Sequence, residues 1–258
     1  MEIWAHRGRS QPTDFGNTLS DFKMAQCLGV TGIETDISFS LDKEVIIYHP
    51  GTTEQDYTKL TWKEIQATGF PIVRLSDLFV FLKNNPRLQC CLDIKENSKE
   101  LVRKVVVAII GADLEERVHL TAFQKRIPRL KMESDVSLLI YAKWICPGIK
   151  THIITPWPIN LVGIAERYRP DAISFGWLQE PWWLRLIGQP FFKGISLAVN
   201  LKKQVREARK IRKGMKIWAG VVNEPKDMLY FIGLGIDGIV TDNPRLLKAL
   251  LDKKEISV

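Results

Sequence analysis

The sequence has few cysteines, and none of them is spaced like a structural metal ligand. The four cysteines are Cys27, Cys90, Cys91 and Cys146. Cys90 and Cys91 are adjacent within a strand pattern, which does not suit a disulfide framework. Disulfide-rich secreted domains and zinc fingers are therefore not favoured, and we expect a reducing compartment.

Long hydrophobic runs and linkers are also lacking. No apolar stretch is long enough to cross a bilayer, and no Pro- or Ser-rich segment divides the chain. The first polar motif begins at His6, which leaves no room for a signal peptide after Met1. We expect a single domain over residues 1–258, located in the cytoplasm, and leave open a peripheral association with a membrane.

Acidic side chains are the minority among the charged residues. The chain has 29 Asp and Glu against 37 Lys and Arg, a net charge of +8. This charge suits anionic partners such as phosphate compounds, nucleic acid or an anionic membrane. However, the basic residues over 201–213 read as the solvated face of a helix, and no nucleic-acid recognition motif is present. We therefore expect no nucleic-acid partner.

Strand patterns alternate with helix patterns along the whole chain, which predicts a parallel sheet. The length suits a (β/α)8 barrel, although periodicity alone leaves a doubly wound sheet open. The fifth strand is expected over residues 137–141, and an extra return strand over 45–48. The eight principal strands are expected to end at His6, Asp36, Lys95, Ala122, Tyr141, Phe175, Val222 and Thr241.

Carboxylates on two of these strands point to a cation. Glu34 and Asp36 stand two residues apart on an otherwise apolar strand, so their side chains share a face. Two buried carboxylates on one face repel each other and are costly to desolvate, and a bound cation offsets both costs. Asp93 and Lys95 repeat the spacing on a later strand. His6, Arg7 and His49 also lie at strand ends, where barrel enzymes carry their chemistry.

Six motifs occur in a fixed order along the chain. They are His6-Arg7-Gly8, Asn17-Thr18, Glu34-x-Asp36, His49, Asp93-x-Lys95 and the run from Gly235 to Pro244. This series resembles the glycerophosphodiester phosphodiesterase family. The resemblance implies a (β/α)8 barrel, with residues 38–75 as a short insertion after the second strand. It also implies hydrolysis of glycerophosphodiesters to glycerol 3-phosphate and an alcohol, with one divalent cation.

The resemblance implies a role for each matching residue. His6 and His49 would be the acid–base pair, as imidazole titrates near neutral pH. Arg7 and Lys95 would contact the phosphate. The cation ligands would be Glu34, Asp36 and Asp93, whose oxygens suit Mg²⁺ or Ca²⁺ better than zinc.

The chain departs from the family pattern at four places. Gly16 replaces a glutamate, with Asp14 nearby as a substitute; Pro50 replaces an aspartate that could orient His49; and Asp93 replaces a glutamate. Gly220 stands where an aromatic residue usually forms a wall for the glycerol. Two alternatives therefore stay open: a phospholipase D-like enzyme that cleaves lysophospholipids, and a non-catalytic phosphodiester-binding protein.

Other candidates are less decisive. Trp177, Trp182 and Trp183 follow the sixth expected strand. They either pack beneath a long loop or form a rim for an acyl chain or a membrane interface. His119 and His152 are interpreted as structural. Asp242 is interpreted as a loop or cap residue rather than a ligand. The sequence does not indicate an oligomeric state.

Overall fold

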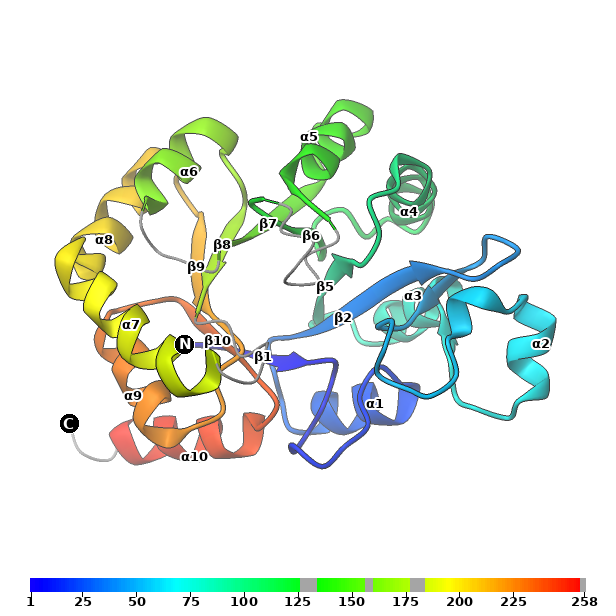
Figure 1. Ribbon diagram of the computed structural model, residues 1–258, viewed down its shortest axis with the longest axis horizontal. Helices are drawn as coiled ribbons and strands as arrows, with labels where there is room; N and C mark the ends of the chain where they lie inside the picture. The colour runs from blue at the N-terminus through cyan, green and yellow to red at the C-terminus, as the bar shows by residue number, and fades with distance from the viewer. Residues whose placement is uncertain (126–133, 156–159, 177–183, 256–258) are drawn as a thin grey trace.

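A computed structural model of the chain describes residues 1–125, 134–155, 160–176 and 184–255, and these form a closed parallel barrel (Figure 1). The first strand of the barrel pairs with both the second and the last, which closes the sheet. The predicted (β/α)8 barrel is thus confirmed. Its strands are β1 (Glu2–His6), β2 (Gly32–Phe39), β5 (Gln89–Ile94), β6 (Val118–Phe123), β7 (Lys150–Thr155), β8 (Ala172–Phe175), β9 (Lys216–Ala219) and β10 (Gly238–Thr241).

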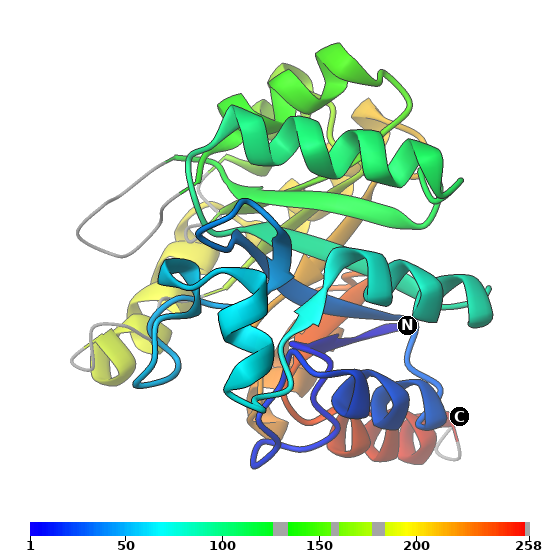
Figure 2. The same ribbon diagram turned by 90° about the vertical axis from the view of Figure 1, so that its right-hand side faces the viewer.

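Helices surround the sheet, and the last lies beside the first (Figures 1 and 2). The Nζ of Lys248 donates to the Leu28 carbonyl at 3.0 Å, which ties the two ends of the ring together. No helix in the described ranges is long and apolar enough to cross a membrane. The helices are α1 (Leu19–Cys27), α3 (Leu75–Asn84), α4 (Lys99–Gly111), α5 (Val136–Ile145), α6 (Leu161–Tyr168), α7 (Leu184–Ala198), α8 (Leu201–Ile211), α9 (Pro225–Gly233) and α10 (Pro244–Glu255).

The predicted insertion after the second strand is present. It contains β3 (Val45–Ile47), a 3-10 turn (Tyr57–Lys59), α2 (Trp62–Ala67) and β4 (Val73–Arg74). The strand β3 pairs antiparallel with β2 and with β4, so the insertion extends the sheet beyond the barrel. Its buried side chains form a small apolar cluster of their own. The insertion therefore fixes the position of His49, which follows β3.

Local signals in the sequence account for several element ends. Thr18 and Asp21 form a reciprocal capping box at the start of α1. The same arrangement of Thr61 and Glu64 starts α2. Gly29 has φ +73° just beyond α1, a conformation that costs glycine little. These ends need no long-range contact to be specified.

The strand predicted over residues 137–141 is wrong, because this stretch lies inside α5. Its run of apolar residues has no clear period, so a strand and a buried helix look alike in sequence. The decisive feature is Asp135, whose side chain accepts from the Ser137 N–H at 2.8 Å and caps the helix. The fifth barrel strand is instead β7, which carries Lys, Thr and His and therefore gave no clear strand pattern.

The apolar core has two parts. The larger lies between the outside of the barrel and the helices. The smaller fills the barrel interior with Trp4, Cys91, Ala172, Trp218 and Val240. These side chains close the amino end of the barrel, so any reaction must occur at the other end, where the strands finish.

Candidate active site

The three acids predicted from β2 and β5 come together at the carboxyl end of the barrel. The register of the two strands places Asp36 directly beside Asp93. Glu34 lies two residues earlier on β2 and points to the same side. Each of these buried residues offers a carboxylate oxygen, and the three oxygens lie within 4.8 Å of one another. We call Glu34, Asp36 and Asp93 the acid cluster.

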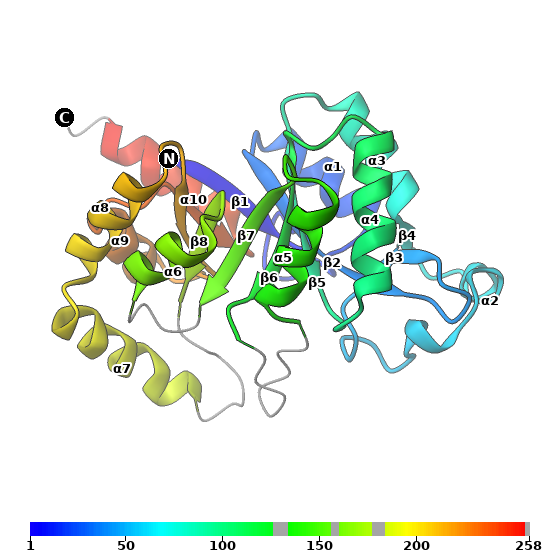
Figure 3. The same cartoon turned by 90° about the horizontal axis from the view of Figure 1, so that it is seen from above.

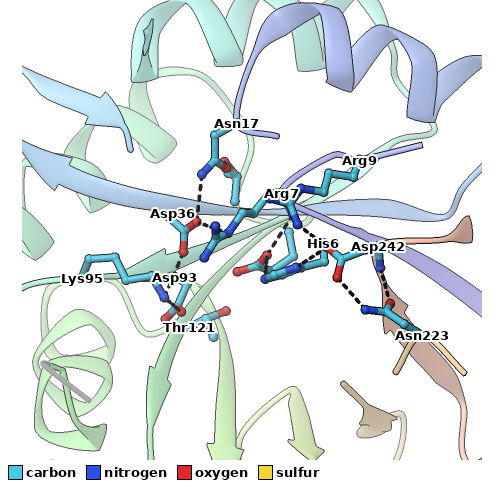
Figure 4. A network of polar contacts seen from close by, with 12 residues as sticks. His6, Arg7, Arg9, Asn17, Asp36, Asp93, Lys95, Thr121, Asn223 and Asp242 are labelled. Atoms are coloured by element: carbon cyan, nitrogen blue, oxygen red, sulfur yellow. Dashed lines mark hydrogen bonds and ion pairs between the residues drawn. The ribbon is translucent and has the colours of Figure 1, made fainter. Parts of the chain in front are cut away.

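Two basic residues neutralise part of the acid cluster (Figure 4). The Lys95 Nζ lies 2.9 Å from Asp36 Oδ1 and also pairs with Asp93. The Arg7 Nε lies 3.1 Å from Asp36 Oδ2. Burial by itself would raise the pKa of Asp36, but Lys95 and Arg7 outweigh it and hold that pKa well below its usual range. Asp36 is therefore ionised.

The other two acids, Glu34 and Asp93, have less neighbouring positive charge to offset their burial. Burial raises the pKa of Glu34 to about 7, and the neighbouring Asp36 carboxylate adds to the effect. Burial also raises the pKa of Asp93, to which Lys95 gives only partial relief. The Oδ1 of Asp93 is buried without a hydrogen-bond partner. A divalent cation would supply the missing positive charge, and three carboxylate oxygens are ligands that Mg²⁺ and Ca²⁺ prefer. The residues therefore fit such an ion.

His6 is held at the end of β1 by a residue far away in sequence. Its Nδ1 lies 2.8 Å from Asp242 Oδ1, and its Nε2 lies 3.8 Å from Glu34 Oε2. Burial would raise the pKa of Asp242, but His6, together with Asn223 and Arg9, outweighs it and keeps that pKa low. Because the ionised carboxylate can only accept, Nδ1 carries the proton and Nε2 is directed at the acid cluster.

Asp242 is itself fixed by two donors. The Arg9 Nη1 donates to its Oδ1 at 2.9 Å, and the Asn223 Nδ2 donates to its Oδ2 at 2.7 Å (Figure 4). Asp242 lies in the loop between β10 and α10, as interpreted from the sequence, and outside the acid cluster, while Asn243 caps α10. Its contact with His6 was not predicted from the sequence. The signal was available: Asp242 directly follows β10, and polar residues at that end of a barrel strand face the site.

His49 reaches the same region from the insertion. Its Nδ1 donates to the Pro50 carbonyl at 2.8 Å, so its Nε2 carries the lone pair. Burial lowers the pKa of His49 to about 4, against the opposing effect of Asp36. His49 lines one small pocket together with Arg7 and Asn17. The backbone carbonyl of Pro50 thus orients the ring in place of the aspartate that this chain lacks.

The replacement at Gly16 has a steric reason. Gly16 has φ +86°, and a Cβ built there would lie 2.8 Å from the Arg7 Cβ. A glutamate at this position would displace the arginine. Asp14 does not substitute for it, because its carboxylate accepts from the N–H and Oγ of Ser10, at 2.9 and 2.7 Å, within a local turn. Our suggestion of Asp14 as a substitute was therefore wrong.

The strand end at Gly220 has no space for an aromatic side chain. A Cβ on Gly220 would lie 2.6 Å from the Val240 Cβ, and one on Gly176 would lie 2.4 Å from the Gly220 carbonyl oxygen. The aromatic wall expected here is therefore absent from this position. The candidate rim residues Trp177, Trp182 and Trp183 lie outside the described residues.

Known proteins resemble the chain in sequence or in fold. A glycerophosphodiester phosphodiesterase from Caldanaerobacter subterraneus subsp. tengcongensis is 26% identical, over 97% of this chain and 98% of its own length. The mouse lysophospholipase D GDPD3 is 24% identical, over 99% and 83%. A putative glycerophosphoryl diester phosphodiesterase from Silicibacter pomeroyi superposes with a TM-score of 0.75 at 18% identity, covering 98% and 94% of the two chains.

A phosphodiesterase from Oleispira antarctica, solved with the product sn-glycerol-3-phosphate, superposes with a TM-score of 0.66 at 17% identity, covering 98% and 97%. The sequence also matches the model of one family over residues 6–246, a stretch that begins at the first histidine of the site and ends just beyond Asp242. The chain therefore belongs to the glycerophosphoryl diester phosphodiesterase family and is a phosphoric diester hydrolase.

Proposed function

We propose that the protein hydrolyses glycerophosphodiesters to glycerol 3-phosphate and an alcohol, using one divalent cation, Mg²⁺ or Ca²⁺. The observation that carries this proposal is the arrangement of two histidines beside the acid cluster. His6 and His49 each have Nδ1 committed to a fixed acceptor, which leaves Nε2 for proton transfer. A protein that only bound phosphodiesters would not need this pair.

Glu34, Asp36 and Asp93 would hold the cation. When bound, the ion would supply positive charge that stabilises the charge developing on the phosphate. It would also offset the cost of burying Glu34 and Asp93, whose pKa values are raised. The support is the donor set itself, in which one oxygen of Asp93 lacks a hydrogen-bond partner.

Arg7 and Lys95 would bind and orient the phosphate. A guanidinium has five N–H donors, and the contact with Asp36 occupies only the Nε of Arg7. The Nζ of Lys95 is held by Asp36 and Asp93, and these two carboxylates outweigh burial and raise its pKa, so it remains charged. His6 and His49 would then give and take the proton at their Nε2 atoms.

Turnover of a soluble diester tests the proposal directly. We expect glycerol 3-phosphate from glycerophosphocholine and glycerophosphoethanolamine in the presence of Mg²⁺ or Ca²⁺. A folded protein that releases no glycerol 3-phosphate from either compound with either ion would contradict the proposal. Binding of both compounds without turnover would favour the non-catalytic alternative.

A second candidate is lysophospholipase D activity on the same barrel, with release of the lysophospholipid headgroup. Two observations favour it: the similarity to mouse lysophospholipase D GDPD3, and Gly220, which stands where the resemblance implies an aromatic wall for the glycerol. Trp177, Trp182 and Trp183 stay candidates for a substrate rim. Comparing lysophosphatidylcholine with glycerophosphocholine distinguishes the two activities, since only the former carries an acyl chain.

We also propose that residues 1–258 act as one domain in the cytoplasm. The continuous barrel supports the first part, since its first and last strands pair with each other. The four cysteines are all unbridged, and Cys27 is exposed, which suits a reducing compartment. Mass measurement of the protein purified under non-reducing conditions would test this, because disulfide-linked material would contradict it.

A further inference from the structure

The helix α7 exposes an apolar side. Ile187, Phe191 and Leu197 are 54%, 58% and 83% exposed. The residues between them on the same side are also exposed and carry no charge. Spacings of three and four residues place such side chains on one face of a helix. We call this face the α7 stripe: Ile187, Pro190, Phe191, Gly194, Leu197 and Ala198.

Two polar side chains of α7 contact the protein instead. Gln189 and Lys193 both donate to Asp227 Oδ1 on α9, the latter at 3.2 Å. Phe192, on the same side, is fully buried and stacks on Phe175 with ring centres 6.2 Å apart. A helix at the surface of a globular protein normally has polar residues outward. Over residues 187–198 of α7, the outward face is the apolar one.

The next helix has the usual arrangement. In α8, Leu201, Val205 and Ala208 are buried. The outward positions of its first turns hold Lys202 and Lys203, both exposed. An exposed apolar face is thus followed directly by exposed positive charge, on a chain with a net charge of +8. This combination is complementary to an anionic lipid surface.

A second copy of the chain suits the stripe less well. Residues 187–198 span about 17 Å of helix, and a helix face is about 10 Å wide, so the stripe covers roughly 170 Å². A stable protein interface needs about 800 Å² from each partner. A helix that lies in the surface of a bilayer needs no such area, because it inserts its apolar side chains among the lipids.

The location of α7 also suits contact with a lipid surface. The helix follows β8, and Figure 3 shows it at the edge of the barrel on the side to which the β7 arrow points. This is the end that carries the acid cluster. We propose that the α7 stripe docks the protein onto a bilayer that contains anionic lipids, with Lys202 and Lys203 contacting the headgroups. The inference rests on the proposed function for its purpose, since docking would bring the site to phosphodiesters at a lipid surface.

Co-sedimentation with vesicles tests the docking without any turnover. The probe is phosphatidylcholine with about one third phosphatidylserine, compared with phosphatidylcholine alone. We expect the wild type to bind the mixed vesicles, and Ile187→Ser with Leu197→Ser to bind about tenfold or more weakly, because two apolar side chains no longer enter the lipid. Lys202→Glu with Lys203→Glu should lower binding to the mixed vesicles only.

A matched control comes from other helices. Val80 on α3 and Val107 on α4 are 60% and 57% exposed, so Val80→Ser with Val107→Ser removes exposed apolar surface elsewhere. This control should bind vesicles like the wild type. The variant Leu197→Asp keeps the test valid if the double variant folds poorly, because a side chain that is 83% exposed contributes little to the core. Leu197→Asp should also weaken binding.

Three outcomes would overturn the inference: no binding of the wild type to mixed vesicles, equal binding by the stripe variants and the control, or a wild-type dimer that the stripe variants convert to monomers. Hydrolysis of soluble glycerophosphocholine should be unchanged in all these variants. Failure of wild-type docking with normal hydrolysis would contradict this inference alone. Failure of hydrolysis with normal docking would contradict the proposed function alone.

Discussion

Several buried ionisable groups at the two ends of the barrel differ in their charge state. At the carboxyl end, Asp36 is kept ionised by Lys95 and Arg7. Toward the amino end, burial lowers the pKa of His119 to about 4 and that of His152 to about 3, so both rings are neutral. Asp36, Lys95 and Arg7 at the carboxyl end thus form ion pairs, whereas the two histidines toward the amino end are neutral.

The surroundings explain the difference. His152 packs edge-on against Trp218 with ring centres 4.8 Å apart, and its Nδ1 lies 3.0 Å from Thr121 Oγ1. His119 packs edge-on against Trp4 at 6.1 Å. These contacting groups are uncharged, and for His119 burial outweighs the opposing effect of Asp171. The acid cluster instead has cationic neighbours, and charge there is suited to binding a cation and a phosphate.

The comparison teaches that similar residue types serve different purposes at the two ends. Amino-end histidines fill the interior and contribute to stability. Carboxyl-end histidines are partly exposed, and each has one nitrogen committed to an acceptor. Substitutions at the two ends should therefore separate activity from stability.

Removing the cation should have the largest effect, because it acts on the carboxyl end alone. Excess EDTA should abolish turnover of glycerophosphocholine, and added Mg²⁺ or Ca²⁺ should restore it. Asp93→Asn should raise the ion concentration needed for half-maximal activity, because it removes a charged ligand. Full activity in a sample shown to hold no metal would contradict the cation site.

Replacement of single histidines should have the next largest effect. His6→Ala and His49→Ala should each lower kcat by about 10²-fold or more, the usual scale for proton transfer, with little change in melting temperature. His152→Ala should do the opposite, lowering stability by about 1–3 kcal/mol through a cavity while leaving kcat nearly unchanged. Turnover and thermal unfolding measured on all three variants would show whether the two ends differ as proposed.

Two aspartates flank β10 and offer a finer comparison. Asp242 follows the strand and holds His6, whereas Asp237 precedes it and accepts from the Ile217 N–H at 2.8 Å. Asp242→Asn should lower kcat by about tenfold or more and change KM little, because His6 loses its fixed tautomer. Asp237→Asn should lower the melting temperature and spare kcat.

Asp242→Glu provides the check for a positioning role, because it retains the carboxylate. Partial recovery of kcat in Asp242→Glu, together with an altered pH profile in Asp242→Asn, would support that role. Equal losses of kcat and stability in both Asp242 variants would show that the residue is merely structural.

The smallest expected effect is on the pH dependence of stability. Without metal, folded Glu34 has a pKa of about 7 against an ordinary 4.5, so the folded state binds more protons and stability falls as pH rises through this window. His152 has a folded pKa of about 3 against 6.5, so the unfolded state binds more protons and stability falls as pH drops below 6.5. Glu34 and His152 should thus make opposite contributions to the pH dependence of stability.

Urea unfolding in EDTA across this pH range would measure both responses. Relative to wild type, Glu34→Gln should gain about 1–3 kcal/mol as pH rises toward 7, and His152→Gln should gain a similar amount as pH falls toward 4. Shifts in the same direction for both variants would refute the assignment of opposite responses.

Much of the site could be predicted from the sequence because its signals are local. The i, i+2 spacing of Glu34 and Asp36 specifies a shared face in any strand. Positions at strand ends specified His6 and His49. The alternation of strands and helices specified the barrel, even though the fifth strand was placed in α5, where an apolar run without a clear period hid the helix.

Only the tertiary structure determined the contacts between residues distant in sequence and which helix faces are buried. His6 and Asp242 are 236 positions apart, and only closure of the barrel by β1 and β10 brings them together. The register of β2 with β5 places Asp93 beside Asp36. Asp227 on α9 accepts from both Gln189 and Lys193, which turns these two side chains of α7 toward the protein, and helical periodicity alone does not reveal this long-range contact. Sequence spacing determines which side chains share a face, but only long-range packing determines what that face meets.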